Sequence, residues 1–191
     1  MEKPIPELIT VEAARDTHRW VAMTALLLAI GVILHTISPN VGGVTPNWTI
    51  AMYSITISLT RPGLTRALGI GFVAGLTLIP SSKSAFPLGN IASELCGAMT
   101  ACILVKAFAL AHLEQLKVKP FIVGFLATTV SGSVFTYILK TWCLGLPLAV
   151  WTRAMLPVVL TVGVAERSCD PGALWSGQED FLCPRKGKRH E

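Results

Sequence analysis

Six stretches of apolar residues alternate with short polar segments along the chain. They occupy residues 20–37, 48–59, 64–79, 91–111, 121–139 and 149–165. The stretches are continuously apolar and lack the two-residue alternation of a half-buried strand, and a helix needs roughly 17–25 such residues to cross a bilayer. The pattern therefore predicts an all-α membrane protein with six transmembrane helices.

The second and third stretches are short, and the sequence TRPG at residues 60–63 separates them. Pro62 and Gly63 break a helix, and one helix running through them would bury Arg61 in hydrocarbon. We therefore predict two short or tilted helices joined by a tight turn. The first stretch follows the polar residues 1–19 without a small-residue cleavage pattern, so it is predicted to remain as a helix.

Basic residues predict the orientation of the six helices. All but three of the sixteen Lys and Arg residues lie near the side that holds the two termini; the exceptions are Lys83, Lys140 and Arg153. Cytoplasmic loops are enriched in Lys and Arg, so both termini are predicted to be cytoplasmic. We expect a multi-pass protein of a cell (plasma) membrane of prokaryotic type.

Three regions follow from this topology. They are a cytoplasmic N-terminal segment at 1–19, a transmembrane domain at 20–165 and a polar, disordered cytoplasmic tail at 166–191.

Composition agrees with a membrane protein, because 52% of the residues are hydrophobic and only 14% are charged. The net charge of +5 is explained by topology and anionic lipid, so no nucleic-acid partner is expected. The five Cys residues form no CxxC pair, which argues against a metal site. The chain contains no HExxH sequence, paired acid cluster or phosphate-binding glycine loop, so no catalytic residue is predicted and an enzyme remains only an alternative.

Glu94 is the only acid inside an apolar stretch. An ionisable residue at membrane depth is a functional hypothesis by default. The alternative is that its charge complements a helix N-terminus, with Asn90 or Ser93 as the cap.

Three loops on the predicted outer face, at 38–47, 80–90 and 140–148, contain Pro, Gly and polar or aromatic residues. Irregular backbone at membrane depth is tolerated where it lines a cavity, so these loops predict a pocket open to the outside. The candidate ligand-binding residues are His35, Asn47, Trp48, Lys83, Asn90, Glu94, Trp151 and Arg153. The alternatives are interfacial anchors for the tryptophans, snorkelling for the bases and a structural role for the histidine.

Such a pocket suits a small zwitterion with an aromatic body. Lys83, Lys140 or Arg153 can pair with its carboxylate, and Glu94 can meet its ammonium group. Trp48 or Trp151 can stack on the ring.

Small residues recur on the first helix, where Ala22, Ala25 and Ala29 fall near one face. Another helix can approach closely at such positions. The stripe therefore indicates either a partner interface or packing inside the bundle.

The run ALLLAIGVILHTISPNVGGVTPNWTIAMYSI, together with SAFPLGN and GLPLAVWTRAMLPVV, resembles the tryptophan-type substrate-binding (S) components of energy-coupling factor (ECF) transporters. The likeness covers residues 20–162 and is most specific at His35, 42–47 and 85–90. After AFPLGN this chain reads IASELCG, where the family usually has a Pro-Asn pair and then an Asp-Lys pair, so the ligand is left open.

The resemblance implies a six-helix bundle with an outer pocket covered by its loops, bordered by Asn47, Phe86 and Asn90. It also implies docking through Ala25 and Ala29 onto a T component that carries two ATP-binding cassette ATPases. The chain itself would need no cofactor, because the partners use the ATP. We therefore expect capture of L-tryptophan or a related aromatic compound; the alternatives are another small nutrient, such as a vitamin or its precursor, or a membrane scaffold without a ligand.

Overall fold

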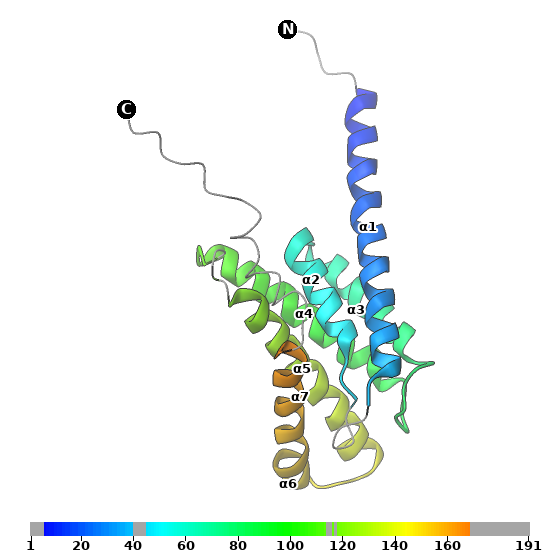
Figure 1. Cartoon of the computed structure of the whole chain (residues 1–191), viewed down its shortest axis with the longest axis vertical. Coiled ribbons are helices and arrows are strands. Elements are labelled where there is room, and N and C mark those ends of the chain that lie inside the picture. Colours follow the sequence, from blue (N-terminus) through cyan, green and yellow to red (C-terminus); the bar gives the residue numbers. More distant parts are fainter. Residues whose placement is uncertain (1–5, 40–44, 114–115, 117, 169–191) are drawn as a thin grey trace.

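The structure is a computed structural model that describes residues 6–39, 45–113, 116 and 118–168 (Figure 1). Within those ranges every regular element is a helix. The elements are α1 (Pro6–Ile37), α2 (Trp48–Thr60), α3 (Leu64–Leu78), α4 (Gly89–Leu110), α5 (Lys119–Tyr137), η1 (Ile138–Cys143), α6 (Leu148–Val150), η2 (Trp151–Met155) and α7 (Leu156–Ser168). The segments η1 and η2 are π-helical and continue α5 and precede α7 without a break.

Four helical segments are long and apolar enough to cross a membrane. They are Trp20–Ile37, Gly89–Leu110, Lys119–Cys143 and Leu148–Glu166. Helices α2 and α3 stand where the second and third apolar stretches predict them, but with 13 and 15 residues they are shorter than a bilayer core requires. Among the described residues the all-helical class is confirmed, and four of their helical segments have spanning length.

The break between α2 and α3 lies at the predicted TRPG sequence. Arg61 ends α2 in the left-handed conformation, with φ of 45°, and its backbone N–H donates to the carbonyl of Ile57 at 2.9 Å. Gly63 then precedes the first residue of α3 in an extended conformation. This tight turn keeps the Arg61 side chain exposed at the end of the bundle.

Helix α4 forms the centre of the bundle and packs against α2, α3 and α5. The contact with α3 is close because it is made through glycine. A methyl group added at Gly75 would lie 2.6 Å from Cα of Ile91, and one added at Gly71 would lie 2.6 Å from the carbonyl oxygen of Glu94. Buried side chains of α2, α4 and α5, including Tyr53, Ala98 and Ala127, complete the core.

The outer surface of the bundle is apolar, as expected for a protein in lipid. Leu26 and Ile33 on α1 are 64% and 62% exposed, and Leu110 at the end of α4 is 82% exposed. Ala22, Ala25 and Ala29 are also exposed on α1, so the small-residue stripe is not used for packing between the described helices.

Helix α7 continues past the predicted boundary at residue 165 and ends at Ser168. Glu166, which the sequence analysis assigned to the polar tail, is 2% exposed in its last turn. The rest of the predicted tail, 169–191, lies outside the described residues. Residues 6–19 of the predicted N-terminal segment belong to α1.

Candidate functional site

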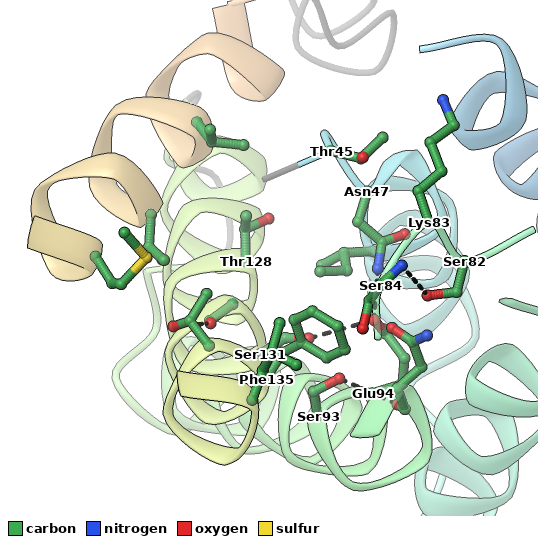
Figure 2. Close-up of a pocket in the computed structure, with 18 of the residues that line it drawn as sticks. Thr45, Asn47, Ser82, Lys83, Ser84, Ser93, Glu94, Thr128, Ser131 and Phe135 are labelled. Carbon is green, nitrogen blue, oxygen red and sulfur yellow. Dashed lines mark hydrogen bonds between the residues drawn. The ribbon is translucent and has the colours of Figure 1, made fainter. Parts of the chain in front are cut away.

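A cavity of about 280 Å³ opens among the ends of several helices (Figure 2). Its lining comes from the end of α1, the start of α2, the loop 82–85, and helices α4, α5, η1 and α7. The volume is close to the lower end of the roughly 300–1,000 Å³ found for small-molecule pockets. The cavity is therefore large enough for a compact ligand.

Glu94 lies in the wall of this cavity on α4 and is 1% exposed. Its Oε1 accepts hydrogen bonds from Nδ2 of Asn47 at 2.5 Å and from the Ser131 hydroxyl at 3.3 Å. Its Oε2 has no hydrogen-bond partner among the described residues, although the hydroxyl of Tyr53 lies close to the same carboxylate. A buried carboxylate oxygen without a donor is costly unless a ligand supplies one.

A second carboxylate, Glu166, reaches the same cavity from the last turn of α7. Its Oε1 accepts a hydrogen bond from the backbone N–H of Asn47, and its Oε2 accepts one from the Thr128 hydroxyl at 3.2 Å. Glu166 was not among the predicted ligand-binding residues, because the sequence pattern places it in the polar tail. One signal points to it: Val159, Val162 and Glu166 recur at helical spacing, and all three are buried.

Asn47 connects the two carboxylates, because its side chain bonds Glu94 and its backbone bonds Glu166. Its Oδ1 also accepts the N–H of Thr49 at 3.2 Å, which caps the N-terminus of α2. The cap holds the side chain in the orientation that directs its amide group toward α4. Asn47 therefore links the start of α2 to the first turns of α4 and to the last turn of α7.

The apolar part of the lining comes from α2, α5, η1, η2 and α7. It includes Ile50, Phe135, Leu139, Met155, Val159 and Val162. Figure 2 places Thr128, Ser131 and Phe135 along α5, facing Asn47 and the loop 82–84 across the cavity. A polar side with two acids therefore stands next to an aromatic and aliphatic side.

Three hydrogen bonds fasten the loops at the edge of the cavity to the end of α1. Nδ1 of His35 lies 2.9 Å from the carbonyl oxygen of Pro46. Nε1 of Trp48 donates to the Ser38 hydroxyl at 2.7 Å, and Nζ of Lys83 donates to the Ser38 carbonyl at 3.1 Å. Trp48 and the Lys83 ammonium group therefore hold the loops in place.

Of the nine predicted ligand-binding residues, the structure brings five to the cavity: His35, Asn47, Lys83, Asn90 and Glu94. Trp48, Phe86, Trp151 and Arg153 are not part of its lining. Nε1 of Trp151 donates to the Thr136 hydroxyl at 3.1 Å, and its ring meets that of Tyr137 edge to face. Arg153 is exposed. Lys140, weighed in the sequence analysis as a partner for a carboxylate, does line the cavity.

No cluster of three or more His, Cys, Asp or Glu side chains that could hold a metal ion is found in the part of the chain that the structure describes. The acids Glu94 and Glu166 are instead surrounded by hydroxyl and amide donors.

The model of the family described as "Tryptophan transporter TrpP" matches residues 17–167. Comparison with curated proteins and with solved structures gave no significant match.

Proposed function

We propose that this chain, which belongs to the tryptophan transporter TrpP family, is the substrate-capture (S) component of an ECF-type importer and binds L-tryptophan or a related aromatic compound in the cavity. The observation that carries the proposal is the pairing of buried carboxylates with an aromatic and aliphatic wall in one cavity. Those two surfaces complement the ammonium group and the ring of an aromatic amino acid.

The orientation of the ligand follows from the lining. The ammonium group faces Glu94, whose Oε2 lacks a donor among the described residues. The indole ring lies against Phe135, Leu139 and Met155, and the carboxylate faces Lys140. The Lys83 ammonium group donates to the Ser38 carbonyl, so we assign it to holding the loop 82–85 against the end of α1.

We place the cavity on the outer side of the cell membrane, with six helices crossing it and both termini in the cytoplasm. In Figure 1 the end of α1, the loop 80–88 and the loop 144–147 lie toward one end of the bundle, and the N-terminus of α1 lies toward the other. The cavity lies at the end that holds these loops and the few outer basic residues. This arrangement agrees with the enrichment of Lys and Arg on the cytoplasmic side.

Uptake then depends on partner proteins. The sequence contains no ATP-binding motif, so we propose that a T component and two ATP-binding cassette ATPases supply the energy. The exposed stripe Ala22, Ala25 and Ala29 on α1 is the proposed contact with the T component.

Equilibrium binding of radiolabelled L-tryptophan to the purified full-length chain in lipid nanodiscs tests the proposal. We expect saturable binding with Kd of about 1 μM or tighter, which corresponds to about 8 kcal/mol. Unlabelled tryptophan should compete, and vitamins should not. Absence of saturable binding in a monodisperse sample would reject tryptophan as the substrate.

The contact with the T component is tested by the double substitution Ala25→Leu and Ala29→Leu. Larger side chains keep two helices apart, so we expect uptake by cells that contain the partner subunits to fall about 10-fold or more. Tryptophan binding by the purified variant should change less than about 3-fold, since both positions lie outside the cavity. Ala107→Leu, at an exposed position on α4, is the matched control and should leave uptake unchanged. Normal uptake by the double variant would place the interface elsewhere.

A further inference from the structure

We propose that Glu94 and Glu166 together form the seat for the ligand's ammonium group, so that the site selects amine-bearing indoles over indole acids. This inference rests on the proposed function and deepens it, because it names Glu166 as a specificity-determining residue. It also predicts which charged group of the ligand contributes more to binding. Removing the ammonium group should weaken binding more than removing the carboxylate.

The geometry of the two acids supports this assignment. Both line the cavity and both are almost fully buried, at 1% and 2% exposure. Both bond the same residue, Asn47, through its side chain and its backbone. Two carboxylates held next to one cavity by one residue form a seat that a single ammonium group can occupy.

The carboxylate of Glu94 can accept a further hydrogen bond. Its Oε2 makes no direct hydrogen bond among the described residues, although the Tyr53 hydroxyl lies close to the same carboxylate. An ammonium group has three donors, and its single positive charge offsets part of the negative charge of two neighbouring acids. A ligand without it leaves a buried negative charge with less compensation, which is strongly unfavourable.

The described bases that line the cavity are less buried than the two acids. Nζ of Lys83 donates to the Ser38 carbonyl, and Nδ1 of His35 lies against the Pro46 carbonyl. Lys140 also lines the cavity and is half-buried, so it can meet the ligand's carboxylate. Solvent screens the pair of Lys140 with the ligand's carboxylate more than it screens the pair of the ligand's ammonium group with the two buried acids. The carboxylate therefore contributes less to binding than the ammonium group.

A matched pair of ligands tests the order of these contributions. Tryptamine lacks the carboxylate of tryptophan, and indole-3-propionate lacks its ammonium group. Radiolabelled forms of all three are bound to the wild-type chain in nanodiscs. We expect indole-3-propionate to bind about 30-fold or more weakly than tryptophan, and tryptamine to bind within about 10-fold of it.

The substitution Glu166→Gln tests the second acid. Glutamine retains an oxygen that can accept the Asn47 N–H but removes the charge. We expect binding of tryptophan and tryptamine to weaken about 10-fold or more, and binding of indole-3-propionate to change less than about 3-fold. Thr128→Ala removes one hydrogen bond to the same carboxylate without changing charge, and it should affect the three ligands equally.

The outcomes separate this inference from the proposed function. If tryptophan binds but indole-3-propionate binds equally well, or if Glu166→Gln weakens all three ligands alike, the inference is wrong and the tryptophan assignment stands. If tryptamine binds with the expected sensitivity to Glu166→Gln and tryptophan does not bind, the substrate assignment is wrong and the ammonium seat stands. If a folded sample binds none of the three, both are rejected.

Discussion

Replacing Glu94 with glutamine is expected to weaken tryptophan binding by about 100-fold or more. The substitution removes a buried carboxylate that lines the cavity, and truncating one partner of a buried charge pair costs about 2–5 kcal/mol. It also presents an amide N–H₂ group either to Nδ2 of Asn47 or to the ligand's ammonium group, where the wild type presents an acceptor. Equilibrium binding in nanodiscs measures the change.

Ser93→Ala is the matched control for Glu94→Gln. Ser93 precedes Glu94 on α4, is equally buried and also lines the cavity, but its hydroxyl donates to the Asn90 carbonyl within the same helix. We expect a change in affinity of less than about 3-fold. If Glu94→Gln retained the affinity of the wild type in a folded sample, the ligand's ammonium group would have to lie elsewhere.

The double substitution Gly71→Ala and Gly75→Ala is expected to give the largest loss of stability. The two added methyl groups would lie 2.6 Å from backbone atoms of Glu94 and Ile91, so α3 and α4 would have to separate. Overpacking of this kind costs about 1–3 kcal/mol for each site. Thermal unfolding in detergent should show a melting temperature lower by several degrees, and ligand binding should weaken because Glu94 moves with α4.

Gly69→Ala provides the control on the same helix. No atom lies within 4 Å of a methyl group added at Gly69, so we expect a melting temperature equal to or slightly above that of the wild type. A double variant as stable as Gly69→Ala would show that α3 and α4 do not pack through these glycines.

The positions of the helices could be predicted because the local signals agree with the packing. Trp48 and Leu64 begin α2 and α3 where the apolar stretches begin, and the turn at Arg61 lies where Pro62 and Gly63 break the helix. The π-helical segments η1 and η2 were not predicted, because a hydropathy pattern does not distinguish a short π-helix from an α-helix.

The residues that line the cavity could be predicted only in part. Glu94 stands out because it is an acid in an apolar stretch. Trp48 and Trp151 were expected to stack on the ligand, yet each donates its indole N–H to a neighbouring hydroxyl and lies outside the lining. Hydropathy does not determine the rotation of a helix, so it cannot tell which aromatic side chains face a cavity.

Glu166 is the reverse case, because it was not predicted to belong to the site but lines the cavity. It follows the last apolar residues and precedes a polar segment, so a hydropathy pattern assigns it to the tail. Its burial depends on the contacts with Asn47 and Thr128, which come from distant parts of the chain. The helical spacing from Val159 was the available signal, and composition alone obscured it.

The hydrogen bond between Asn47 and Glu166 joins residues that are 119 positions apart. During synthesis the ribosome must therefore release nearly all of α7 before the second acid can reach the start of α2. Until then one wall of the cavity is missing, and the backbone N–H of Asn47 lacks this acceptor. Formation of the complete cavity therefore requires α7, and a chain interrupted before residue 166 would lack one of the two buried acids.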